Sequence, residues 1–226
     1  MNKKVIISIA VILGILIADQ ILKFYIKTNF ALNDSVTLIK GFGELLFVEN
    51  SGMAFGMKFS GTGGKIALSV FRLVAIGGLV YYLIRLIKKN EHIILIICLS
   101  LVIAGATGNF IDSAIYGLIF DTGTTYDPGI EYWVGYRGIS QFSSEGYSKP
   151  LVGCVVDMLH FTAKWPSWVP RIGGQEIFKA IFNIADSAIT ISVFLMILFY
   201  KRIFPHNKTV KEKSKNTPEA EIKLED

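Results

Sequence analysis

Aspartates and amides at short spacing are the residues of this sequence best suited to a reaction. Asn109 stands three residues before Asp112, and Asn183 three before Asp186, so each pair shares one face of a helix. Asp157 is a further acid. Two carboxyl groups in a partly desolvated site can share one proton, because close like charges do not both ionise. The ionised group is then a general base for water and the protonated group polarises a carbonyl, which is aspartyl peptidase chemistry.

Other reaction centres are missing from the sequence. It contains no Gly-x-Ser-x-Gly, no phosphate-cradling loop and no His close to a Ser. His92, His160 and His206 are scattered, without the spacing of a zinc site. We therefore expect neither a metal nor a cofactor.

The composition indicates a membrane protein. Of the 226 residues 52% are hydrophobic and 18% are charged, against about 25% charged in a typical soluble domain. The net charge of +5 lies within residues 1–204, among apolar runs, whereas residues 205–226 carry five Lys and five Asp or Glu. This distribution argues against nucleic-acid binding, and we expect 205–226 to be a disordered cytoplasmic tail. Residues 1–204 are expected to form a single membrane-embedded domain.

Four stretches have the length and apolar character of a transmembrane helix, about 20 residues. They are residues 5–25, 66–87, 93–117 and 177–200. A cleaved signal peptide is the alternative for the first, but no small-x-small site follows it. Lys and Arg residues precede the first stretch, separate the second from the third and follow the fourth. The positive-inside rule therefore predicts that both termini lie in the cytoplasm.

In this topology the two segments between the spans on the outer side are residues 26–65 and 118–176. Residues 26–65 alternate around 35–39 and 45–48, so short strands forming a small β cradle are expected between the first two helices. Counting helical rise places Asp19, Asp112 and Asp186 roughly 20–30 Å above the inner boundary. Asp157 precedes the fourth stretch on the same side, and Arg72 enters the second from outside. A polar cavity that opens to the outer surface is expected.

Explanations of the same acids and amides without catalysis stay open. A single Asp near a helix end is often merely interfacial, and inward-facing Asn often only joins helices. Asp19 and Lys23 could form a simple i,i+4 pair. A small proton-coupled transporter would use the same acids as a relay, although its acids should run through both leaflets. A structural membrane protein with no reaction is the second alternative.

Several blocks of the sequence together resemble the lipoprotein signal peptidase II family. Residues 49–56 resemble its Asn-x-Gly-x-Ala-Phe block, and 104–112 its Gly-Gly-x-x-Gly-Asn-x-x-Asp-Arg block. Residues 155–158 match Val-x-Asp-Phe, and 182–187 match Phe-Asn-x-Ala-Asp-Ser. Asp19 and Lys23 match an Asp and a Lys near the end of the first span. The blocks follow the family order from residue 19 to 189.

The resemblance implies a function. The family comprises four-helix enzymes of the bacterial inner membrane, with the active site on the outer, periplasmic side. They cut the signal peptide from diacylglyceryl-modified prolipoproteins, just before the lipidated cysteine, and are the target of the cyclic peptide globomycin. By the matching blocks, the catalytic pair would be Asp157 and Asp186. Substrate-binding or supporting residues would be Asn50, Gly52, Asn109, Asp112, Asn183, Asp19 and Lys23. Lipidated prolipoproteins and membrane lipids are the expected partners, and the protein is expected to be a monomer.

Two departures from the family pattern stand out. Ser113 occupies the place of the arginine that usually follows the aspartate, so a positive charge is missing or comes from Arg72 or Arg137. Asp112 and Asp157 are also 45 residues apart, where about a dozen is usual. The additional segment, residues 120–150, is rich in Tyr, Phe and Trp, and we expect an aromatic insertion on the outer membrane surface. A lid or substrate-binding loop and a lineage-specific addition are both compatible with it.

Overall fold

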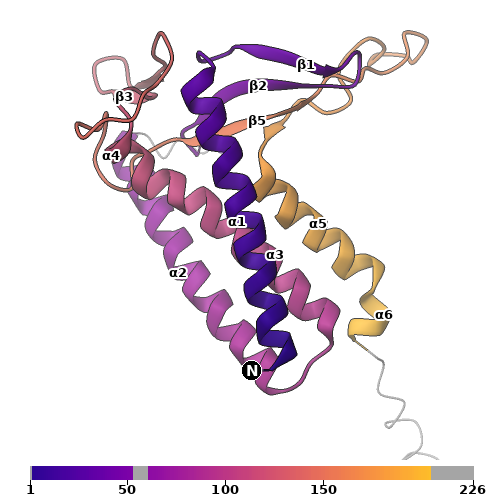
Figure 1. Ribbon diagram of the computed structural model, residues 1–226. Helices are drawn as coiled ribbons and strands as arrows, with labels where there is room; N and C mark the ends of the chain where they lie inside the picture. Colours follow the sequence, from indigo (N-terminus) through magenta and orange to yellow (C-terminus); the bar gives the residue numbers. More distant parts are fainter. Residues whose placement is uncertain (1, 53–60, 205–226) are drawn as a thin grey trace, which may run out of the picture.

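Apolar helices and a small sheet at one end make up the fold. A computed structural model describes residues 2–52 and 61–204 (Figure 1). The expected tail at 205–226 and residues 53–56 of the first family block lie outside the described residues. The helices run side by side, and the sheet stands at the end opposite the N-terminus.

In the part of the chain that the structure describes, three helices have the length and hydropathy to cross a membrane. They are α1 (Lys3–Asn29), α2 (Gly61–Lys88) and α3 (Ile93–Ile111), which continues through a π-helical turn, η1 (Asp112–Tyr116), and α4 (Gly117–Ile119). The helices α1 and α2 contain the predicted spans 5–25 and 66–87. The third helical segment runs from Ile93 to Ile119 and so contains the predicted span 93–117. Along α1 large apolar residues such as Ile6, Leu13 and Ile17 remain exposed. In a helix that is apolar on all faces, such positions suit contact with lipid.

The predicted fourth span, residues 177–200, is wrong at its beginning. The helix α5 is Ile184–Leu198, 15 residues, followed by the short α6 (Tyr200–Ile203). Asn183 is the N-cap of α5, so the helix cannot begin before Ile184. The preceding residues, Ile181 and Phe182, pair with the strand 155–161 instead of extending the helix. At 1.5 Å per residue α5 is shorter than an apolar membrane core of about 30 Å.

The helix α3 lies between α1, α2 and α5 and is the most buried of the long helices (Figure 1). Small residues permit its contact with α5. A Cβ on Gly105 would collide with the Ala185 carbonyl oxygen, so glycine is needed at this crossing. The contact brings the outer ends of α3 and α5, and their polar residues, together.

The β cradle is built from both outer segments. Its strands β1 (Ser35–Ile39), β2 (Gly43–Asn50), β5 (Val155–Phe161) and β6 (Ile181–Phe182) form an antiparallel sheet in that order. The expectation of a cradle from residues 26–65 alone is therefore corrected. The local sequence pattern of residues 155–161 did not predict that this segment pairs with β2, which lies more than 100 residues earlier in the chain. The register places Val48 opposite Asp157 and Asn50 opposite Val155.

The insertion at 120–150 has an exposed part and a packed part. Its hairpin of β3 (Thr125–Asp127) and β4 (Tyr132–Val134) exposes Tyr132, and Phe142 is also exposed. Its base, by contrast, joins the outer hydrophobic core, where Phe120 is fully buried and Tyr136 and Tyr147 pack. Its location on the outer membrane surface stays a prediction, and its base packs within the protein. Aromatic side chains there bury more area against α1 than they would at a surface.

Candidate active site

Asp157 lies in the middle of β5 with both carboxyl oxygens hydrogen bonded. The Asn183 side-chain amide donates to Oδ1 (2.7 Å) and the Asn50 amide donates to Oδ2 (3.2 Å). The side chain is buried. Burial, and then the negative charge of Asp186, raises the pKa of Asp157 to about 7. A carboxyl group with this pKa holds a proton for part of the time near neutral pH.

Asp186 stands in the first turn of α5 and is half-buried. It forms a capping box with Asn183: the Asn183 side chain accepts from the Asp186 backbone N–H (2.9 Å), and the Asp186 carboxylate accepts from the Asn183 backbone N–H (3.4 Å). The Asn109 amide donates to Oδ1 (2.7 Å). The N-terminal end of a helix favours a negative charge, so this position suits a carboxylate.

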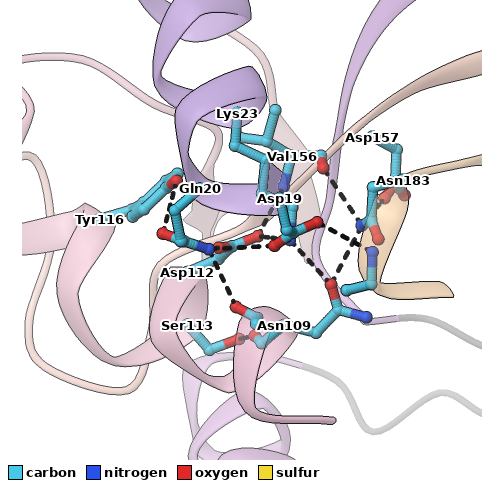
Figure 2. A network of polar contacts seen from close by, with 12 residues as sticks. Asp19, Gln20, Lys23, Asn109, Asp112, Ser113, Tyr116, Val156, Asp157 and Asn183 are labelled. Atoms are coloured by element: carbon cyan, nitrogen blue, oxygen red, sulfur yellow. Dashed lines mark hydrogen bonds and ion pairs between the residues drawn. The ribbon is translucent and has the colours of Figure 1, made fainter. Parts of the chain in front are cut away.

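Two asparagines join the surroundings of the two aspartates. The Asn183 amide, which donates to Asp157, also donates to Asn109 Oδ1 (3.0 Å) and more weakly to the Val156 carbonyl (3.3 Å). Asn109 in turn donates to Asp186. Figure 2 shows this chain of side chains from α3 to β5. Because each amide has few possible orientations, the network holds the aspartates in one mutual arrangement.

A buried ion cluster lies beneath this network. Lys23, with no exposed surface, pairs with Asp19 (2.8 Å) and Asp112 (2.7 Å), and its ammonium donates to Asn109 Oδ1 (3.0 Å). Gln20 donates to Asp19 and Asp112 and accepts from the Tyr116 hydroxyl (Figure 2). These partners stabilise the buried Lys23 ammonium, because an unpaired buried charge costs several kcal/mol.

The two acids of the ion cluster each bind the backbone next to a candidate catalytic residue. Asp19 accepts from the N–H of Ala185, which precedes Asp186 (2.9 Å). Asp112 accepts from the N–H of Val156, which precedes Asp157 (3.3 Å). The pair around Lys23 therefore fixes the start of α5 and the middle of β5 relative to α1 and α3.

Gly52 and Asn50 form a tight turn at the end of β2. The Gly52 N–H donates to Asn50 Oδ1 (2.8 Å), which turns the amide nitrogen of Asn50 towards Asp157. Gly52 has a φ of +88°, and a Cβ there would come within 2.6 Å of Leu68 Cδ2. The positive φ favours glycine at this position, and any larger residue would also displace the Leu68 side chain.

All nine residues expected from the sequence thus lie in one connected site, but three contributors were not expected. Gln20 and Tyr116 belong to the ion cluster. Lys27 lies one turn beyond Lys23 and pairs with Glu49, the residue before Asn50. The spacing of Asp19, Lys23 and Lys27 at i, i+4 and i+8 was a signal for a shared polar face of α1.

An apolar cavity of about 380 Å³ adjoins the site. Asp186 is on its wall, with Phe161, Phe178, Phe182, Ser187, Thr190 and Ile191. Such a cavity suits a hydrocarbon or apolar peptide group next to a carboxyl pair. Within residues 2–52 and 61–204, no three His, Cys, Asp or Glu residues are grouped as a metal site.

A family model described as signal peptidase (SPase) II matches residues 11–202. A lipoprotein signal peptidase of Porphyromonas gingivalis is 41% identical over 202 residues, covering 85% of this chain and 82% of that protein. One of Amoebophilus asiaticus is 30% identical over 205 residues, covering 88% and 79%. A solved bacterial membrane enzyme has a TM-score of 0.55 and 27% identity, with 85% of this chain and 91% of that chain covered.

Proposed function

This chain belongs to the signal peptidase II family and is a membrane protease that removes signal peptides from prolipoproteins, and from that premise we propose that Asp157 and Asp186 are its catalytic pair. The observation that carries the proposal is the asparagine bridge, which joins the Asp157 and Asp186 carboxyl groups through Asn183 and Asn109. The transporter alternative has no support from the comparisons.

The environments of the two aspartates suggest different roles. Asp186, at the helix N-terminus, takes a proton from water, and the resulting hydroxide adds to the scissile carbonyl carbon. Asp157, whose pKa is raised by burial, donates its proton to the carbonyl oxygen. When the tetrahedral intermediate collapses, one of its hydroxyl protons returns to Asp157, the C–N bond breaks, and the proton held by Asp186 passes to the leaving amine. The asparagines hold the pair in this arrangement without taking part in proton transfer.

We propose that the substrate is a diacylglyceryl-modified prolipoprotein, cut just before the lipidated cysteine. The apolar cavity beside Asp186 supports this, since Phe161, Phe178 and Phe182 offer apolar surface within reach of the carboxyl pair. Acyl chains would lie in lipid between the helices while the scissile peptide enters the polar site. Globomycin would bind at the same site.

The location we propose is the bacterial inner membrane, with both termini cytoplasmic and the site on the outer side. The N-terminus, the turn between α2 and α3, and α6 lie together at the end opposite the sheet (Figure 1). This end carries a group of basic residues, Lys3, Lys4, Lys88, Lys89, Lys201 and Arg202. The positive-inside rule places such an end in the cytoplasm. We propose that the protein acts as a monomer.

The test is cleavage of a purified lipidated precursor by Asp157→Asn and Asp186→Asn. Each exchange keeps the side-chain size and removes a carboxyl group, so we expect turnover to fall by at least about 10³-fold with folding retained. Asp34→Asn changes an exposed acid whose carboxylate accepts from the Ala31 N–H, and as the matched control it should cleave normally. Globomycin should inhibit the wild-type protein. Wild-type-like turnover by either site variant would exclude the aspartyl pair.

A further inference from the structure

The outer part of α2 presents a polar face towards the site. Lys65, Ser69 and Arg72, at i, i+4 and i+7, share this face. Ser69 is buried and its hydroxyl donates to the carbonyl of Leu151, so the face lies against the chain that leads into β5. Lys65 is also buried, and its ammonium has no hydrogen-bond partner in the described part of the chain. Lys65 and Arg72 therefore place two cations on the wall that α2 contributes beside Gly52 and Ser113.

Arg72 is held at this wall by a single weak contact. Its Nη1 donates to the Ser113 hydroxyl at 3.4 Å, and among the described residues it forms no ion pair. A guanidinium has five N–H donors in a planar fork, so most of them are available. The carboxylates that act on it most strongly are those of Asp186, Asp112 and Asp157. Ser113 donates its hydroxyl to the backbone carbonyl of Asn109, whose side chain binds Asp186, so the contact with Ser113 brings the Arg72 guanidinium to the side of the molecule where the candidate catalytic residues are found.

The charges of the site explain why a cation is needed there. Asp19, Asp112, Asp157 and Asp186 bring four negative charges, and Lys23 compensates only one. With Lys65 and Arg72 included, a single negative charge remains, and one proton shared by the Asp157 and Asp186 pair removes it. Because uncompensated buried charge is costly, the cations of α2 balance the site without occupying their donors in direct ion pairs.

We infer that Arg72 contacts the substrate, donating hydrogen bonds to a peptide carbonyl oxygen at the scissile bond. The inference rests on the proposed function and adds a substrate-contacting residue to it. Negative charge develops on that oxygen during attack by water, before the proton of Asp157 is fully transferred to it. A guanidinium beside the oxygen at that stage favours the transition state over the bound substrate. Ser113, which stands where the family pattern has an arginine, donates its hydroxyl to the Asn109 carbonyl (3.2 Å) and leaves room for the Arg72 fork.

The first test compares Arg72→Gln and Arg72→Lys with the wild-type protein on a lipidated precursor. We expect kcat/KM to fall about 10- to 100-fold in Arg72→Gln, mainly through kcat, as expected for a lost charged hydrogen bond. Arg72→Lys keeps the charge but loses the fork and should fall in between. Arg85→Gln is the matched control on the same helix, since Arg85 lies at its cytoplasmic end over Tyr81. Unchanged kcat/KM in both Arg72 variants overturns the inference.

The second test separates contact with substrate from a purely structural role. If Arg72 served only to hold Ser113, Ser113→Ala would lose as much activity as Arg72→Gln; we expect it to lose clearly less. In Arg72→Ser/Ser113→Arg the guanidinium returns from the opposite wall, and we expect at least a tenfold recovery over Arg72→Ser. The acidic limb of the pH profile should also move upward in Arg72→Gln, because a lost positive charge makes the nearby carboxyl groups harder to ionise. If the acidic limb of the pH profile did not move in Arg72→Gln and the double variant recovered no activity, contact between Arg72 and the substrate would be contradicted.

Failure of this inference is distinguishable from failure of the proposed function. An inactive wild-type protein on the lipidated precursor would refute the proposed function itself. An active wild-type protein with fully active Arg72 variants would refute only the role of Arg72. Thermal midpoints in detergent show whether each variant is folded, and if Arg72→Gln is not, the Arg72→Lys value decides.

Discussion

Two buried lysines one turn apart on α1 have different surroundings. Lys23 and Lys27 are both fully buried. Lys23 is surrounded by two carboxylates and an asparagine amide oxygen. Lys27 pairs with one carboxylate, that of Glu49, and also donates to the Thr122 carbonyl (3.1 Å) and the Tyr136 hydroxyl (3.4 Å). Two lysines on the same helix therefore have different roles: Lys23 neutralises acids of the site, and Lys27 binds Glu49 and the insertion.

The surroundings of Lys27 show what the insertion does structurally. The rings of Phe120, Tyr136 and Tyr147 lie 5.0–5.3 Å from its ammonium, a cation–π arrangement that compensates for missing carboxylates. The second oxygen of Glu49 accepts from the Thr124 N–H. Since Glu49 precedes Asn50 on β2, the base of the insertion is fastened to the strand that supplies a partner of Asp157. Lys23 thus holds Asp19 and Asp112, which bind the backbone beside the candidate catalytic residues, and Lys27 links β2 to the base of the insertion.

The largest difference between the two lysines should appear on removal of Lys23. Lys23→Met leaves two buried carboxylates without their cation, which we expect to cost about 3–5 kcal/mol and to abolish cleavage. Thermal unfolding in detergent and cleavage of the lipidated precursor measure the two effects. A variant as stable as the wild-type protein would show that the ion cluster does not hold α1, α3 and α5 together.

Removal of Lys27 should have a smaller effect. In Lys27→Met one carboxylate is left, which keeps the Thr124 N–H, and methionine packs well against the three aromatic rings. We expect a loss of about 2–3 kcal/mol. Adding Glu49→Gln removes the remaining charge and should restore part of that loss. A double variant less stable than Lys27→Met would show that Glu49 does not depend on Lys27.

The third effect concerns pH and arises from the burial of Asp157 and the charge of Asp186 rather than from either lysine. The folded pKa of Asp157 is raised to about 7, above an unfolded value of about 4. The folded protein therefore retains a proton that the unfolded chain releases, and this stabilisation is present below about pH 4 and is lost as pH rises through 7. Cleavage should also decline through pH 7, because Asp157 acts as the acid.

Thermal midpoints between pH 5 and 8 measure this dependence. Asp157→Asn should flatten it, whereas Lys27→Met should keep it, since Lys27 pairs with Glu49 and the pKa of Asp157 is raised by burial and by Asp186. If the dependence were identical in Asp157→Asn and the wild-type protein, another group would be responsible for it.

Much of the site was predictable because its residues carry local signals. The spacings of Asn109 with Asp112 and of Asn183 with Asp186 indicate shared helix faces, and they also form recognisable blocks. Lys27 was missed because its partners Glu49, Thr122 and Tyr136 are 22 to 109 residues away. No local pattern contains such contacts.

The sequence by itself determined the apolar helices, the level of the acids along them, and the family. These follow from hydrophobic length and from short motifs, which act within one or two turns of chain. The tertiary structure alone decided where α5 begins, which strands complete the cradle, and which arginine reaches Ser113. Those outcomes depend on capping, strand pairing and helix packing between segments far apart in the chain. Their free energy is gained only when the segments meet.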